Sequence, residues 1–83
     1  MKLSWRKEFV DGLWTWKSGA YKITRWTADD RGNKVRQYTA MFTGSAGYPP
    51  ERLNDRPLLD LDHAKRLCGD HLDLMRVRLG KVG

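Results

Sequence analysis

The sequence predicts an α+β domain in which a three-stranded antiparallel meander packs on one C-terminal helix. Residues 13–43 alternate apolar and polar side chains and are rich in aromatic and β-branched residues, which is typical of strands. Residues 61–79 instead repeat apolar side chains every three or four positions, which is typical of an amphipathic helix. Because 83 residues leave room for a single core, we expect one domain over residues 1–83.

The N-terminal segment, residues 1–11, mixes apolar and charged side chains. Its apolar residues are Leu3, Trp5, Phe9 and Val10. Two structures fit this mixture, namely an edge segment packed on the core or a short N-terminal helix. Both are favoured over a disordered tail, since apolar side chains of this size need burial.

We expect the sheet over residues 12–43. Its strands are expected at residues 13–17, 20–27 and 35–43. Ser18-Gly19 is a two-residue hairpin turn candidate, and residues 28–33 are dense in turn-forming side chains. Two consecutive hairpins give the antiparallel meander.

Residues 44–57 contain all three prolines, which are Pro49, Pro50 and Pro57. Proline fixes φ and removes a backbone donor, so we expect a long loop without a regular element. Loops of this length in a small domain commonly carry function.

We expect a helix over residues 58–79. Asp60 is the N-cap candidate, and Asp62 lies in the first turn, where the helix dipole favours negative charge. One apolar stripe runs along it: Leu61, Ala64, Leu67, Cys68, His71, Leu72, Met75 and Leu79. This stripe needs an apolar partner, and one face of the sheet is the only candidate large enough.

Strand alternation assigns side chains to the two faces of the sheet. The apolar set expected under the helix is Trp14, Trp16, Tyr21, Ile23, Tyr38, Ala40 and Phe42. The opposite face then carries Lys22, Thr24 and Trp26 in the middle strand. Trp26 is therefore predicted to be an exposed aromatic residue.

Residue spacing argues against catalysis, metal binding and any cofactor. The single cysteine, Cys68, excludes an intramolecular disulfide and falls on the buried stripe, where a thiol is inert. His63, Cys68 and His71 lack the spacing of a metal site. No phosphate-binding loop or nucleophile motif is present. We therefore expect a non-enzymatic protein with no catalytic residue, metal or cofactor.

Neither membrane insertion nor secretion is indicated by the sequence. No apolar run approaches the roughly 20 residues of a membrane helix. The first residues also lack the uninterrupted apolar segment of a signal peptide. We expect a cytoplasmic protein that does not act at a membrane.

Charge gives the strongest functional signal. Lysine and arginine number 16 against 10 acidic residues, a net charge of +6, and residues 1–36 carry +5 of it (nine basic, four acidic). Basic side chains interleaved with aromatic ones are typical of nucleic-acid binding, in which cations hold phosphates and a tryptophan stacks or wedges. The candidate binding residues are Lys17, Lys22, Arg25, Trp26, Arg31, Lys34 and Arg36.

The order strand-strand-strand-helix, with Tyr21-Lys22-Ile23, Tyr38-Thr39-Ala40 and Asp62-His63-Ala64-Lys65, resembles the arm-binding domain of phage tyrosine integrases. The plant ethylene-response-factor domain is related to it. The chain is also similar to small phage and prophage proteins with the same layout. The likeness covers about residues 13–75 and implies a sheet that reads the major groove of DNA, in the cytoplasm of a phage host. The long loop at 44–57 departs from the tight connection of the integrase domain.

A helical N-terminus would give the order α-β-β-β-α, which resembles double-stranded RNA-binding domains. Ala64-Lys65-Arg66 then corresponds to part of their second helix. Asp60 and Asp62 stand where that family places phosphate-binding lysines, and carboxylates repel the backbone. DNA is therefore favoured over RNA.

These observations predict a small phage-type binding protein whose basic sheet face engages nucleic acid. The alternative is a phage-encoded inhibitor or adaptor that binds a host protein through Trp26 and the loop at 44–57. A homodimer joined through an edge strand fits either function.

Overall fold

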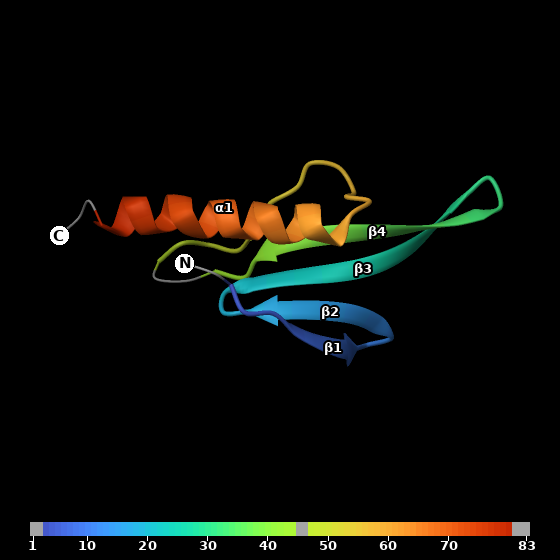
Figure 1. Ribbon diagram of the computed structural model, residues 1–83, viewed down its shortest axis with the longest axis horizontal. Coiled ribbons are helices and arrows are strands. Elements are labelled where there is room, and N and C mark those ends of the chain that lie inside the picture. Colours follow the sequence, from blue (N-terminus) through green and yellow to red (C-terminus); the bar gives the residue numbers. More distant parts are fainter. Residues whose placement is uncertain (1–2, 45–46, 81–83) are drawn as a thin grey trace.

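The computed structural model describes residues 3–44 and 47–80, with side chains up to residue 77. It is an α+β fold made of one antiparallel sheet and one C-terminal helix (Figure 1). The elements are β1 (Arg6–Val10), β2 (Leu13–Ser18), β3 (Tyr21–Asp30), β4 (Asn33–Phe42), β5 (Glu51–Arg52) and α1 (Leu61–Gly80). The five strands lie in the sheet in chain order. The predicted meander and C-terminal helix are confirmed, whereas the predicted count of three strands is wrong.

Two hairpins close on turns that need a left-handed backbone. Asp11-Gly12 joins β1 to β2 with φ of 53° and 80°, and Arg31-Gly32 joins β3 to β4 with φ of 54° and 85°. Two successive positive φ angles are typical of a type I′ turn, whose twist matches that of the flanking strands. The second turn is also fixed by Asp29, whose Oδ1 accepts a 3.0 Å hydrogen bond from the Gly32 N–H.

One face of the sheet and one side of α1 form the core. The buried apolar side chains are Trp16, Tyr21, Ile23, Tyr38, Ala40, Phe42, Ala64, Cys68 and Met75. Ile23 pairs with Trp16 on one side and with Ala40 on the other, so it lies at the centre of this face. The predicted assignment of the sheet faces is confirmed, with Trp14 half-buried beside the core. Leu79 of the predicted helix stripe lies outside the described side chains.

The helix α1 begins at Leu61, three residues later than predicted. Asp60 is its N-cap, as the sequence predicted. The Asp60 Oδ1 accepts a 2.9 Å hydrogen bond from the N–H of Asp62, and the Asp60 carbonyl accepts one of 3.2 Å from the N–H of Ala64. Leu58 is not helical because its backbone pairs with Tyr38 at the edge of β4.

The N-terminal segment forms the strand β1. The helical alternative for this segment was therefore wrong, and the edge-segment alternative is confirmed. The residues of β1 pair with β2 along their whole length. The physical cause is the Asp11-Gly12 turn, which returns the chain antiparallel to itself, together with the packing of Phe9 on Trp14 at a ring separation of 5.0 Å. Three of the five β1 side chains are charged, which disfavours pairing of this edge with another strand.

The segment at 44–57 is not a free loop, contrary to the prediction. After β5 pairs with β4, the Leu53 N–H donates a 2.9 Å hydrogen bond to the Ala40 carbonyl. The Asn54 Oδ1 then accepts a 2.9 Å bond from the Ala40 N–H, and its Nδ2 donates one of 2.8 Å to the Arg56 carbonyl. The Asn54 amide thus continues the edge pairing of β4 where the backbone turns away. The prolines did not prevent pairing because they flank residues 51–54 rather than interrupt them.

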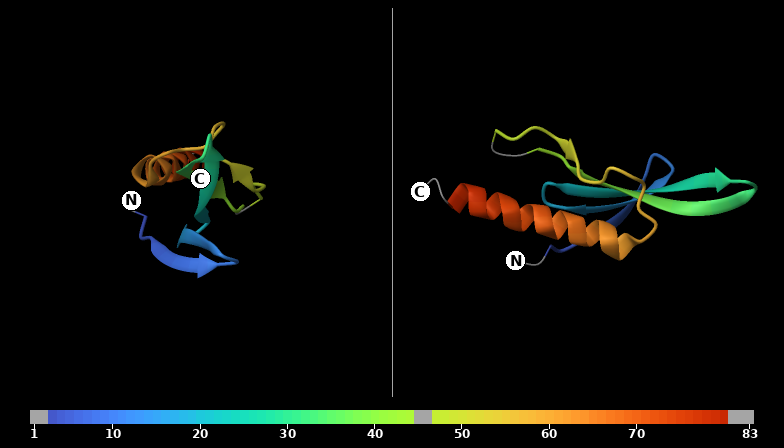
Figure 2. Two further views of the ribbon diagram at one scale, coloured as in Figure 1. Left: turned by 90° about the vertical axis from the view of Figure 1, so that its right-hand side faces the viewer. Right: turned by 90° about the horizontal axis from the view of Figure 1, so that it is seen from above.

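The β3–β4 hairpin extends beyond the rest of the sheet as an arm, residues 27–36, at the right of Figure 1. β2 pairs with β3 only between Tyr21 and Thr24, whereas β4 pairs with it as far as Asp30. The arm makes the molecule elongated, with extents of 53 × 23 × 22 Å. The helix lies along one face of β3 and β4, and Figure 2 shows that it leaves the other face of the sheet uncovered.

Candidate functional site

The sheet face that α1 leaves uncovered is the candidate site, called here the open face. The pairing register arranges its side chains in three rows across the strands. The first row is Arg6, Lys17, Lys22, Met41 and Arg52. The second row is Glu8, Thr15, Thr24 and Thr39. Beyond it lie two pairs, Val10 with Leu13 and Trp26 with Gln37, which are called here the third row. Along the strands the open face therefore changes from cationic, through hydroxyl-bearing, to largely apolar.

Four of the five side chains in the first row are cations. Lys17 and Lys22 are direct cross-strand partners, and Arg52 lies beyond Met41 on the next strands. Neighbouring strands are only about 4.8 Å apart, and like charges directly opposite each other destabilise a sheet. A bound polyanion would remove this repulsion.

Glu8 neutralises part of the cationic row. Its carboxylate oxygens lie 2.9 Å from the Arg6 Nη2 and 3.3 Å from the Lys17 Nζ. Among the residues that the structure describes, Lys22 and Arg52 form no ion pair. These two side chains carry the uncompensated positive charge of the row.

Trp26 stands toward the other end of the open face, with 46% of its surface exposed. Its Nε1–H donates a 3.1 Å hydrogen bond to the Thr39 Oγ1 on β4. Indole N–H groups usually find such a partner, and here the bond fixes one edge of the ring on the sheet. The ring is therefore held in one orientation while part of it stays open to solvent.

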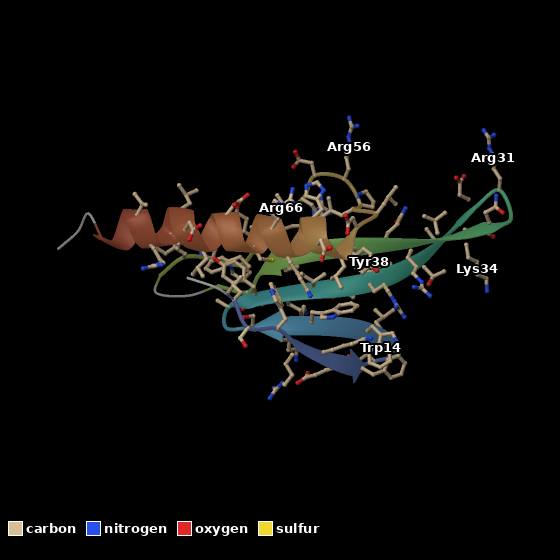
Figure 3. All side chains as sticks on the ribbon, viewed as in Figure 1. Trp14, Arg31, Lys34, Tyr38, Arg56 and Arg66 are labelled. Carbon is tan, nitrogen blue, oxygen red and sulfur yellow. The ribbon has the colours of Figure 1, made fainter. Side chains whose placement is uncertain are left out.

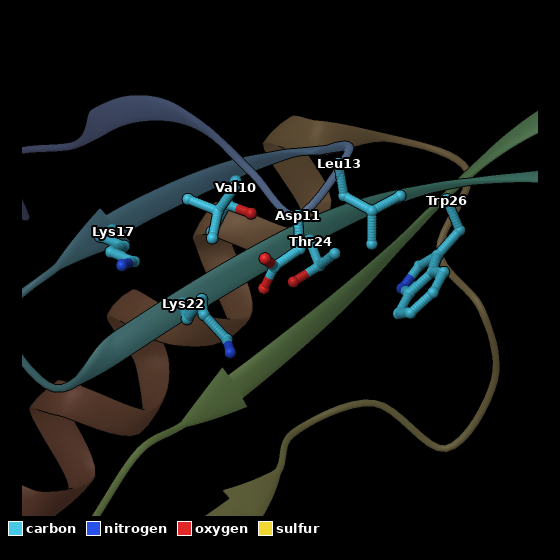
Figure 4. A pocket seen from close by; sticks show the side chains of 8 residues that line it. Val10, Asp11, Leu13, Lys17, Lys22, Thr24 and Trp26 are labelled. Carbon is cyan, nitrogen blue, oxygen red and sulfur yellow. The ribbon is translucent and has the colours of Figure 1, made fainter.

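The open face is hollowed between Trp26 and the lysines, as Figure 4 shows. The hollow measures about 220 Å³ and is lined by Val10, Asp11, Leu13, Thr15, Lys17, Lys22, Thr24 and Trp26. In Figure 4, Lys17 and Lys22 lie toward one end and Trp26 at the other, with the Asp11 carboxylate beside Thr24. Ammonium, carboxylate, hydroxyl and aromatic groups thus share one small concavity.

The structure brings together three of the seven predicted binding residues, Lys17, Lys22 and Trp26, on the open face. The sequence analysis placed neither Arg6 nor Arg52 in the same row as these residues. The signal for Arg6 was the Asp11-Gly12 turn, which fixes the β1 register. Arg52 had no comparable local signal, because its strand is defined by pairing with β4 alone.

The remaining four predicted binding residues do not join this group. Arg25, Lys34 and Arg36 lie on the opposite side of the β3–β4 ladder, because successive strand residues point to opposite faces. Arg31 occupies the turn at the tip of the arm, and Figure 3 shows Arg31 and Lys34 at that far end. These four residues belong to the arm and the covered face.

A partly buried polar cluster lies between the helix and the covered face, with the exposed Glu51 at its edge. A 2.8 Å hydrogen bond joins the Tyr21 hydroxyl and the His71 Nδ1, and the His71 Nε2 lies 3.8 Å from the Glu51 carboxylate. Burial and, to a smaller extent, the neighbouring Cys68 raise the pKa of Tyr21. Burial also raises the pKa of the Cys68 thiol to about 12, so the thiol stays protonated and is a poor nucleophile. This cluster connects helix and sheet.

Within residues 3–44 and 47–80, no group of three or more His, Cys, Asp or Glu side chains is placed to hold a metal ion. Among the same residues, no helix has the length and apolar composition needed to cross a membrane.

Comparison of the chain with protein families, with curated proteins and with solved structures gave no significant match.

Proposed function

We propose that this protein is a small, non-enzymatic nucleic-acid-binding protein that uses the open face. The observation that carries the proposal is the cationic row, in which Lys22 and Arg52 have no ion-pair partner among the described residues and Lys17 directly faces Lys22. Phosphate contacts dominate the affinity of proteins for nucleic acid, and each neutralised phosphate releases bound counterions.

The cationic row and Trp26 would make two different kinds of contact with the nucleic acid. Lys17, Lys22 and Arg52 would hold phosphates, which positions the nucleic acid without reading its sequence. Trp26 would add a sequence-tolerant stacking contact. The resemblance to the integrase arm-binding domain supports DNA over RNA and a phage origin.

A titration of labelled DNA and RNA at two salt concentrations tests the proposal. We expect binding at low salt and, with Lys17, Lys22 and Arg52 as three phosphate contacts, a salt slope of about −2.7 on duplex DNA, which is a loss of about 40-fold between about 50 and 200 mM salt. The double variant Lys22→Ala/Arg52→Ala should bind more weakly and lower the salt slope by about 1.8 units on duplex DNA, about 0.9 per lost contact.

A matched control removes the same charge from the exposed side of the helix. Arg66 and Arg76 are both exposed on α1, away from the open face (Arg66 in Figure 3). The double variant Arg66→Ala/Arg76→Ala should leave the salt slope unchanged. Absence of binding at low salt, or equal losses in both double variants, would refute the proposal.

A protein partner is the second candidate, favoured by the apolar third row of Val10, Leu13 and Trp26. Of the predicted composite surface of Trp26 with the segment at 44–57, Arg52 shares the open face with Trp26, and residues 51–54 pair along the edge of β4. A protein partner would therefore bind at the open face. If no nucleic acid binds, capture of a protein by the native chain but not by Trp26→Ala would support this candidate.

A further inference from the structure

We propose that the hollow of the open face takes an unpaired nucleotide, with its base against Trp26 and its phosphate at Lys17 and Lys22. The inference rests on the proposed function and names its ligand more narrowly, as single-stranded rather than fully paired nucleic acid. It follows from the shape of the hollow, the fixed indole and the separation of charges within it.

The orientation of Trp26 is set before any ligand arrives. Its hydrogen bond to Thr39 holds the edge of the indole, and the same side chain lines the hollow. The Trp26 side chain therefore loses little conformational entropy when a base stacks on it, and a preorganised contact of this kind favours binding. Leu13 and Val10 extend the apolar surface next to it.

The two ends of the hollow suit the two ends of a nucleotide. Lys22 and Trp26 are four residues apart on β3, which is about 13 Å at 3.3 Å per residue. Thr15 and Thr24 line the hollow between them, and of the two only Thr24 is partly exposed, so its hydroxyl would meet a sugar. The Asp11 carboxylate also lines the hollow and would repel phosphate, which leaves the lysine end for the anion.

A paired base is excluded from such a contact. In a duplex both faces of a base are covered by its neighbours, so a base reaches an aromatic side chain in a hollow only if it leaves the stack. An unpaired strand does not incur this unstacking cost. The hollow should therefore favour single strands, whereas a flat or convex sheet face would favour binding in the groove of a duplex.

The experiment compares three labelled DNA probes of the same length by fluorescence anisotropy: a single strand, its duplex and a single strand with abasic sites. A base stacked on an aromatic side chain raises affinity by roughly an order of magnitude, so we expect the single strand to bind about tenfold more tightly than the abasic strand. We expect the duplex to bind more weakly than the single strand by a similar factor.

Two variants of Trp26 identify the contact. Trp26→Ala should lose about tenfold on the single strand, with little loss on the abasic strand and an unchanged salt slope. Trp26→Phe retains an aromatic face and should recover most of the affinity. Leu74→Ala is the control, since Leu74 is an exposed apolar residue of similar exposure (49%) on the helix. Circular dichroism and thermal melting establish that each variant is folded.

Each outcome decides between the two proposals. Equal or tighter binding of the duplex, or equal binding of the abasic strand, would overturn the nucleotide site and leave nucleic-acid binding by the cationic row intact. Binding of none of the three probes at low salt would overturn both. Loss of abasic binding in Trp26→Ala would assign Trp26 a structural role instead.

Discussion

The two faces of the sheet are built from the same strands and differ in what their side chains achieve. On the covered face, Ile23 is fully buried between Trp16 and Ala40 and contributes to stability. On the open face, its neighbours Lys22 and Thr24 meet solvent, and Lys22 directly faces another lysine. One face is arranged for stability, while the other retains charge repulsion that stability alone does not explain.

This difference indicates where selection for function can act in so small a domain. A chain of 83 residues has one core, and substitutions within that core threaten folding. The open face is free of that constraint, because the helix α1 covers only the other side. Variants on the two faces should therefore separate stability from binding.

The largest effect is expected for Ile23→Ala on the covered face. Removing a fully buried isoleucine side chain costs about 2–5 kcal/mol, because apolar contacts are lost and a cavity remains. Thr24→Ala, one residue along and on the other face, should cost less than about 1 kcal/mol. Urea unfolding followed by circular dichroism measures both, and similar losses would contradict the assignment of faces.

Alkaline pH should destabilise the covered face next. The unfolded thiol of Cys68 loses its proton near pH 9, whereas burial holds the folded pKa at about 12. Between these values the unfolded state binds fewer protons, so the free energy of unfolding falls by at most about 1.4 kcal/mol per pH unit. The raised pKa of Tyr21 acts in the same direction above pH 10.

The variant Cys68→Ala isolates the thiol contribution. Its free energy of unfolding, measured relative to its own value at pH 8, should fall less steeply above pH 9 than that of the native chain. A thiol reagent should also fail to label native Cys68 and should label it after unfolding. Identical pH profiles, or rapid labelling of the native chain, would show that the thiol is not buried as described.

A smaller loss, about 1–3 kcal/mol, is expected for Asn54→Ala at the edge of β4. The substitution leaves the buried N–H of Ala40 without the side-chain oxygen that now accepts its hydrogen bond. The control is Asp55→Ala, the exposed next residue. Hydrogen exchange of the Ala40 amide should accelerate in the first variant only, and unchanged exchange would contradict the role of Asn54.

The smallest change in stability, below about 1 kcal/mol, is expected for Trp26→Ala. The side chain is half exposed and makes one side-chain hydrogen bond, to Thr39. Thermal melting measures the change. A loss as large as that of Ile23→Ala would place Trp26 in the core rather than on a binding surface.

Local signals predicted much of the covered face. Alternation in β3 and β4 placed Ile23 and Trp26 on opposite faces, and Asp60 was recognised as the helix N-cap because its short carboxylate can accept from the first turn. The strand β5 escaped prediction, and β1 was predicted only as one of two alternatives, an edge segment or a short helix. The β1 segment is mixed in character, and β5 is only two residues long and lies between prolines.

The candidate site was predictable only in part for the same reason. Lys17, Lys22 and Trp26 lie in strands with clear alternation, so their common face follows from the sequence. Arg25, Lys34 and Arg36 were chosen for their charge, and their positions in the ladder turn them to the other side. Arg6 and Arg52 enter the row only through strand pairing.

The amino-acid sequence by itself determined the fold class, the core side chains and the sign of the charge, because each depends on local periodicity or composition. Tertiary structure alone decided that four cations from four strands form one row and that Trp26 lines a hollow beside it. Such a row joins residues up to 46 positions apart, from Arg6 to Arg52. Cross-strand register brings them together, and register is a property of the assembled sheet rather than of any one segment.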